Sequence, residues 1–258
     1  FNEPFFFNVS DNLVEETDEA HTDISYAVVA KEKLPVTREV RLSDITYHYH
    51  GSDKLIFDHA TVSFPIGRSI GVVGTSGAGK TTIIDILLGL LKLQGGSVLA
   101  DDVDIQDHYR EWIANVGYIQ QMIFLLDADI RKNVAFGIPE EEIDDGKLWY
   151  ALQEAQLDEF VRALPDGVNT GIGERGIRLS GGQRQRIGIA RALYNDPEVL
   201  ILDEATSALD NDTEAAIMES INRLHGKKTL VIIAHRLQTI EKCDMVFRVE
   251  SGKIERDR

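Results

Sequence analysis

Apolar and polar residues alternate along two stretches in the first third of the chain. In Val40–Tyr49 the apolar side chains fall mostly on every second position, which predicts a strand with one buried face. A second such strand is predicted at Ala60–Phe64. Tyr47 and Tyr49 are expected to share a strand face, where an aromatic ring could stack on an adenine. For a strand tyrosine taken alone, a packing role is the simpler interpretation.

Other short segments are apolar throughout, as in strands that are buried on both faces. These are Ser69–Val73, Val199–Leu202 and Thr229–Ala234. Two further strands are predicted at Gly95–Leu99 and Val116–Gln121. Buried strands of this kind predict a parallel sheet, in which functional groups gather at the carboxyl ends of the strands.

Helical spacing of apolar residues follows these runs. Ile83–Leu88 predicts an inward-facing helix. Between Ile130 and Leu164 the helical pattern continues until Pro165-Asp166-Gly167 ends it, which predicts a small helical subdomain. Another helix, apolar on one face and rich in arginine, follows Leu179–Gln183.

Composition narrows the class of protein. The 258 residues include 27 basic and 43 acidic side chains, and a net charge of −16 argues against nucleic acid as the main partner. The single cysteine, Cys243, cannot form an internal disulfide and fits a reducing cytosol. Residues 1–38 combine four phenylalanines with an acidic run that has no clear period, and we interpret them as a linker.

The segment Gly74–Thr82 matches the phosphate-binding pattern G-x-x-x-x-G-K-[ST] at every position. It lies between a predicted buried strand and a predicted helix, which is the context that this chemistry needs. Glycines allow consecutive backbone N–H groups to surround phosphate oxygens at the positive end of a helix. Lys80 would meet the β- and γ-phosphates, and the Thr81 hydroxyl would bind Mg²⁺.

Three further groups fit the same chemistry. Asp203, at the end of a buried strand, would face the metal, and Glu204 could accept a proton from an attacking water. The glycines that follow Ser180 lie at a predicted helix N-terminus, which favours an anion. His235 ends the last predicted strand, where it could donate a hydrogen bond to a γ-phosphate, although a lone histidine is more often structural.

Together these motifs resemble the nucleotide-binding domain of ATP-binding cassette (ABC) transporters over residues 39–258. The resemblance implies an α/β fold: a P-loop NTPase core with a mostly parallel sheet, an antiparallel β subdomain, and a helical subdomain at about 122–190 that carries the signature motif. It also implies ATP and Mg²⁺ as cofactors. Gln120 departs from the proline that is frequent there, and Gln121 is taken as the Q-loop glutamine.

The resemblance assigns roles residue by residue. The nucleotide would be bound by Tyr49, Gly74, Thr75, Ser76, Gly77, Ala78, Gly79, Lys80, Thr81, Thr82, Gln121, Ser180, Gly181, Gly182, Gln183 and Asp203. The catalytic group would comprise Glu204, His235, Gln121 and Lys80, and the metal ligands Thr81, Gln121 and Asp203. Ser207–Asp210 would form the D-loop.

Thr170–Gly176 is similar to the segment with which exporter-type members touch their membrane domain. This implies an ATPase that powers export, located at the cytoplasmic face of a membrane, with residues 1–38 following a transmembrane domain. The implied partners are that transmembrane domain and a second nucleotide-binding domain in a head-to-tail dimer, expected to be a homodimer. No nucleic-acid partner is expected, and the transported substrate stays open.

Two other classes of ATP-binding protein fit the sequence less well. A soluble ABC-type ATPase acting on nucleic acid or ribosomes would be expected to carry a basic face or a long coiled-coil insertion, and the sequence has neither. A regulatory cassette that binds ATP without hydrolysing it fits poorly with the presence of Glu204 and His235.

Overall fold

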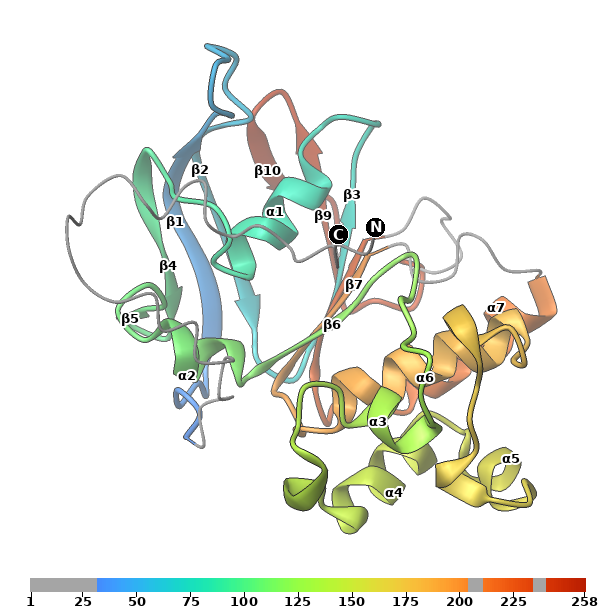
Figure 1. Ribbon diagram of the computed structural model, residues 1–258. Coiled ribbons are helices and arrows are strands. Elements are labelled where there is room, and N and C mark those ends of the chain that lie inside the picture. Colours follow the sequence, from blue (N-terminus) through green and yellow to red (C-terminus); the bar gives the residue numbers. More distant parts are fainter. Residues whose placement is uncertain (1–31, 204–210, 234–239) are drawn as a thin grey trace.

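A computed structural model describes residues 32–203, 211–233 and 240–258 of the chain (Figure 1). It divides into a large sheet at the centre, a smaller antiparallel sheet on one side, and a group of helices on the other (Figure 1). This mixed α/β architecture confirms the predicted fold class.

The large sheet has six strands in the order β10-β9-β3-β8-β7-β6. Four adjacent strands run from the middle of this sheet to one edge: β3 (Ser69–Val73), β8 (Thr229–Ile233), β7 (Val199–Asp203) and, at the edge, β6 (Val116–Ile119). They are parallel to one another, as is β9 (Met245–Glu250) beside β3, and only β10 (Lys253–Arg256) is antiparallel. The carboxyl ends of the parallel strands therefore meet at one edge of the sheet.

The smaller sheet has the order β2-β1-β4-β5. Its strands are β1 (Glu39–Tyr47), β2 (Phe57–Pro65), β4 (Gly95–Ala100) and β5 (Val103–Asp104). The first strand ends at Tyr47, so the prediction that Tyr49 shares a strand face with Tyr47 is wrong. Tyr49 lies in the turn that follows, because the chain changes direction there and approaches helix α1 (Lys80–Leu87).

The helical part lies beyond the other face of the large sheet (Figure 1). It contains α3 (Ile130–Val134), α4 (Asp145–Glu154), α5 (Asp158–Arg162), α6 (Gly181–Leu193) and α7 (Asn211–Asn222), with 3-10 turns at Glu140–Glu142, Gly167–Asn169 and Glu174–Gly176. The single continuous helical pattern of the sequence is thus realised as several short helices. The turn at Gly167–Asn169 follows Pro165, where the pattern was predicted to end.

Alternate residues of each central strand build two separate cores. Leu200 and Leu202 of β7 pack with the helical part, whereas Val199 and Ile201 pack with α1 and the antiparallel sheet. On the latter side the Trp112 indole of α2 (Tyr109–Ile113) donates a hydrogen bond of 2.8 Å to the carbonyl of Leu87 in α1. Helices α1 and α6 therefore lie on opposite faces of the sheet.

The last residues of the predicted linker pack against the domain. Leu34 and Val36 are buried. The Asp101 carboxylate, in the turn between β4 and β5, accepts hydrogen bonds from the backbone N–H groups of Thr37 at 3.0 Å, Arg38 at 2.9 Å and Glu39 at 3.1 Å. This contact fixes the point at which the chain enters β1.

Candidate functional site

The glycine-rich loop joins β3 to α1 in a conformation that requires glycine at several positions. Gly77 has φ of +75° and Gly79, the N-cap residue of α1, has φ of +107°. A Cβ at Gly74 would lie 2.6 Å from the carbonyl oxygen of Val249, whereas a Cβ at Gly77 would meet nothing within 4 Å. The loop is thus pressed against β9 at its start and open on its outer side.

Lys80 is buried within this loop, with 6% of its surface exposed. Its ammonium group donates hydrogen bonds of 3.0 Å to the carbonyls of Gly74 and Thr75. A buried ammonium needs such partners, because an unpaired charge would be costly to desolvate. Phosphate oxygens that enter the loop would meet a lysine already directed toward its interior.

The start of α1 fits an anion. Its N-cap residue, Gly79, has no side chain to bond the first free N–H groups, and its first turn contains no acidic residue. The positive end of this helix is therefore not neutralised by its own sequence. Backbone N–H groups in this position are the donors that bind phosphate in other proteins.

Two oxygen ligands that suit Mg²⁺ lie on this side of the sheet. The side chain of Thr81 follows Lys80 in α1 and is exposed, and Asp203 is the last residue of β7. Mg²⁺ prefers hydroxyl and carboxylate oxygens, usually a few from the protein and the rest from water and phosphate. The donor set therefore fits a magnesium ion bound together with a nucleotide.

Asp203 has two neighbours that the sequence analysis missed. The Tyr118 hydroxyl, from β6, donates a hydrogen bond of 3.3 Å to Asp203 Oδ2. Burial, together with the negative charge of Asp203, raises the pKa of Tyr118 well above its ordinary value. Burial and the charge of Asp203 likewise raise the pKa of the Asp85 carboxyl, on α1. One signal was available in the sequence: Asp85 lies four residues after Thr81, on the same face of a helix.

Tyr49 reaches the same region from the antiparallel sheet. Its hydroxyl is 2.9 Å from the Thr82 hydroxyl, at the start of α1. Its ring meets the Tyr47 ring edge to face, with centroids 5.2 Å apart, and 44% of the residue is exposed. The tyrosine is thus fixed at two points and keeps part of its ring open to a ligand.

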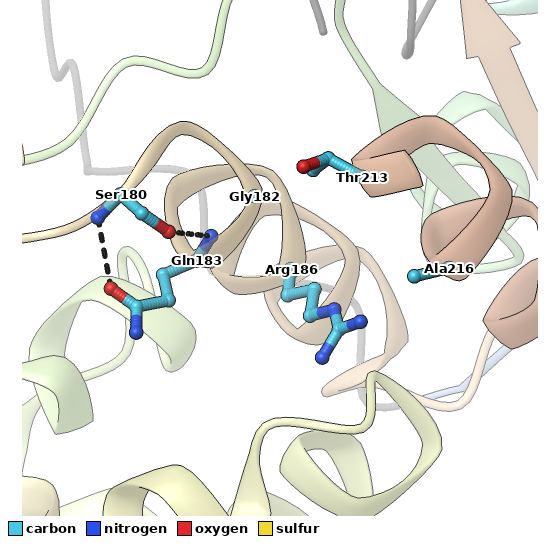
Figure 2. Close-up of a pocket in the computed structure, with 6 residues that line it drawn as sticks. All are labelled: Ser180, Gly182, Gln183, Arg186, Thr213 and Ala216. Carbon is cyan, nitrogen blue, oxygen red and sulfur yellow. Dashed lines mark hydrogen bonds between the residues drawn. The ribbon is translucent and has the colours of Figure 1, made fainter. Parts of the chain in front are cut away.

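The segment Ser180–Gln183 forms the N-terminus of α6 with a reciprocal capping box. The Ser180 hydroxyl accepts a hydrogen bond of 3.2 Å from the Gln183 amide, and the Gln183 side chain accepts one of 2.8 Å from the Ser180 amide. Figure 2 shows these residues at the edge of a pocket of about 360 Å³. Its lining consists of Ser180, Gly182, Gln183, Arg186, Thr213 and Ala216.

Gly182 allows α6 and α7 to approach beside this pocket. A Cβ at Gly182 would lie 2.7 Å from the Thr213 methyl group. Arg186 projects from α6 toward the pocket (Figure 2). Its guanidinium donates a hydrogen bond of 2.9 Å to the carbonyl of Gln156. Arg186, Thr213 and Ala216 were not predicted, since only the folded chain brings α7 beside α6.

The predicted site residues therefore fall into two groups. Lys80, Thr81, Tyr49 and Asp203 gather around α1, while Ser180–Gln183 lies on α6, across the sheet (Figure 1). Gln121 follows β6 and is exposed. Glu204, Ser207–Asp210 and His235 lie outside the described residues, and their roles stay predictions.

The loop at Thr170–Gly176, predicted to contact a membrane domain, is held against the helical part. The Ile172 amide donates a hydrogen bond of 3.1 Å to the carbonyl of Ala128, and Asp129 pairs with Gly171 in an isolated β-bridge. Three strongly exposed apolar side chains flank this loop and Gln121 in the sequence: Met122, Phe124 and Ile177, with 82%, 62% and 79% exposed. Among the described residues, no helix has the length and apolar character that crossing a bilayer demands.

Comparison with known proteins identifies one family. The family model described as "ABC transporter" matches residues 57–207. "ABC transporter B family member 29, chloroplastic" of Arabidopsis thaliana is 41% identical over 85% of this chain and 35% of its own length. "ATP-dependent lipid A-core flippase" of Vibrio cholerae is 40% identical over 85% of this chain and 38% of its own length.

A solved structure, a bacterial Atm1-family ABC exporter with ATP bound, has a TM-score of 0.75 and 32% identity. The match covers 86% of this chain and 39% of that one. The chain thus spans well under half the length of these relatives, and corresponds to one part of each.

Proposed function

Because this chain belongs to the ABC transporter family, as an exporter nucleotide-binding domain, we propose that it binds ATP and hydrolyses it to power transport across a membrane. The observation that carries the proposal is the loop before α1, in which the buried Lys80 ammonium is directed to the interior of a glycine-lined turn. Exporter relatives leave the nucleic-acid alternative without support.

In this proposal Lys80 and the N–H groups of Gly77–Thr81 bind the β- and γ-phosphates, and the Tyr49 ring stacks on the adenine. Thr81, Asp203 and Gln121 hold Mg²⁺, which, when bound, neutralises phosphate charge during transfer. Glu204 accepts a proton from the attacking water, and His235 donates a hydrogen bond to the γ-phosphate.

The arrangement of the two groups of residues favours a site shared by two chains. Helices α1 and α6 cover opposite faces of one sheet, so Ser180 does not gather with Lys80 of its own chain. A second copy, placed head to tail, would bring its Ser180 hydroxyl and Gly181–Gly182 amides to the γ-phosphate. The donors around the phosphates are complete only in such a dimer.

A membrane domain is the second proposed partner. Met122, Phe124 and Ile177 are exposed apolar side chains that flank Gln121 and the loop at Thr170–Gly176 in the sequence, and a partner that contacts the loop would cover apolar surface there. A partner that contacts these side chains would also lie next to Gln121, so a movement of Gln121 would reach it through direct contact. The domain would then lie at the cytoplasmic face of the membrane. Relatives named for lipid A and for a chloroplast leave the substrate undefined, since specificity belongs to the membrane domain.

The experiment is Mg²⁺-dependent phosphate release from ATP, measured per mole of protein over a wide range of protein concentration. We expect the specific rate to rise with concentration, because two copies build each site. The matched variant Glu204→Gln should bind ATP equally well, release no phosphate above background and favour the dimer. A specific rate that does not change with concentration in a monomeric protein would refute the shared site. Normal turnover by Glu204→Gln would show that Glu204 is not the proton acceptor.

A further inference from the structure

The Asp203 carboxylate is held from the side by a neighbouring strand. Tyr118 pairs with Ile201 in the parallel register of β6 and β7, and Asp203 follows Ile201 by two residues. Because side chains alternate along a strand, Tyr118, Ile201 and Asp203 point to the same face of the sheet, the face covered by α1. The resulting hydrogen bond joins the Tyr118 hydroxyl to Asp203 Oδ2 at 3.3 Å.

Tyr118 is well suited to act as a fixed donor. Its ring is half-buried and packs against the core beneath α1. Gly117, the residue before it, fixes the position of β6: a Cβ there would lie 2.6 Å from Leu200 and 2.7 Å from the carbonyl of Ala192. Glycine therefore lets β6 pack closely against β7 and α6, and the ring of Tyr118 carries its hydroxyl from this closely packed strand.

The orientation of Asp203 matters because a second carboxylate is near. Asp85 extends from α1 close enough for the charge of Asp203 to act on it. A tyrosine hydroxyl has one proton to donate, and here it is directed to Asp203 Oδ2. This hydrogen bond favours one orientation of the Asp203 carboxylate, although a second carboxyl group stands on the neighbouring helix.

We propose that Tyr118 is a positioning residue for Asp203, and that its hydroxyl sets how tightly Mg²⁺ binds with the nucleotide. The proposal rests on the proposed ATP site. Groups that orient a metal ligand through a hydrogen bond commonly change metal affinity when they are removed. Tyr118 itself contacts neither phosphate nor metal in this proposal, so nucleotide binding without Mg²⁺ does not depend on it.

The test is a titration of Mg²⁺ against the binding of a fluorescent ATP analogue, with a parallel measurement in EDTA. For Tyr118→Phe we expect Mg²⁺ to be bound about 3- to 10-fold more weakly, the range for loss of one hydrogen bond. Binding in EDTA should match the original protein. Tyr109→Phe is the matched control, because Tyr109 is also half-buried, lies on α2, and its hydroxyl has no hydrogen bond to any described residue.

A double-mutant cycle separates positioning from packing. In an Asp203→Ala background the further change Tyr118→Phe should alter Mg²⁺ affinity by less than about 2-fold, because alanine has no oxygen for the hydroxyl to orient. An equal loss in both backgrounds, or unchanged Mg²⁺ affinity in the single variant, would overturn the proposal. If the original protein binds the analogue in no condition, the proposed ATP site itself fails, which is a different result.

Discussion

A side chain in this domain can contribute both to the stability of the fold and to ligand binding. For Lys80 the two contributions can be measured separately. Its ammonium donates hydrogen bonds to the Gly74 and Thr75 carbonyls. Both bonds lie within the loop itself, and neither joins it to another element of the fold. Lys80 is therefore expected to matter more to the ligand than to the fold.

For Lys80→Ala we expect ATP affinity to fall roughly 10- to 100-fold, the loss typical of charge-assisted hydrogen bonds. The temperature of unfolding should stay within a few degrees. Calorimetric titration and thermal unfolding measure the two effects, and Lys92→Ala, an exposed lysine in the next loop, is the control. Undiminished ATP binding by Lys80→Ala would contradict the site.

Asp244 has a purely structural role at the opposite edge of the sheet. Its carboxylate accepts hydrogen bonds from the Ser69 amide at 2.8 Å, the Ser69 hydroxyl at 3.0 Å and His225 at 2.8 Å, with Arg68 3.9 Å away. Burial alone would raise the pKa of Asp244, but these hydrogen bonds outweigh it, so the pKa lies below its ordinary value.

A lowered pKa in the folded state means that Asp244 stabilises the fold above the pKa of an unfolded aspartate, near 3.9. That contribution is lost as the pH falls through the folded value. We expect Asp244→Asn to lower the free energy of unfolding by about 1–3 kcal/mol at pH 7, with the difference from the original protein shrinking below about pH 4. Urea unfolding across this range measures it; a difference independent of pH would refute the assignment.

At the scale of secondary structure, some elements could be predicted to the residue. Ser69–Val73 matches β3 and the run ending in Asp203 matches β7, because both are continuous apolar strands with polar residues or glycine at their ends. The helical part was less predictable. Its short helices are separated by turns whose positions depend on packing against α6 rather than on periodicity.

The candidate site shows the same division. Lys80, Thr81 and Asp203 follow from local motifs, whereas Tyr118 acquires its role only through the pairing of β6 with β7. Tyr49 was expected on a strand, and lies instead in a turn that brings its hydroxyl to Thr82. Local motifs do not predict contacts between residues that are far apart in the sequence.

The N-terminus of α6 gives an element-scale prediction, because Ser180 both caps the helix and is proposed to meet a γ-phosphate. Ser180→Ala should lower the free energy of unfolding by about 1 kcal/mol through loss of the cap. Ser180→Asp should keep the cap, since aspartate accepts the same Gln183 amide.

The order of the two variants should reverse for phosphate release: Ser180→Asp is expected to be the more stable variant and the less active one. A carboxylate at position 180 would repel the phosphate of a facing chain, so Ser180→Asp should depress phosphate release more than Ser180→Ala does. Urea unfolding and phosphate release test both halves. If Ser180→Asp released phosphate as fast as the original protein, Ser180 would be a helix cap alone.

For the whole molecule, charge opposes the proposed dimer. Each copy carries a net charge of −16, and two copies repel each other over about 30 Å at 0.01 M salt but only about 8 Å at 0.15 M. We expect ATP-bound Glu204→Gln to associate more strongly as salt rises over this range, as measured by sedimentation. Weaker association with added salt would mean that attraction between unlike charges dominates the interface.

The hydrogen bonds to Asp101 attach the start of β1 to the antiparallel sheet. Three consecutive amides, at Thr37, Arg38 and Glu39, bind one carboxylate where β1 begins, and the same strand leads at its far end to Tyr49. A pull on the preceding chain is therefore borne first by the antiparallel sheet. A single strand thus links the entering chain at one end to the ring proposed for the adenine at the other.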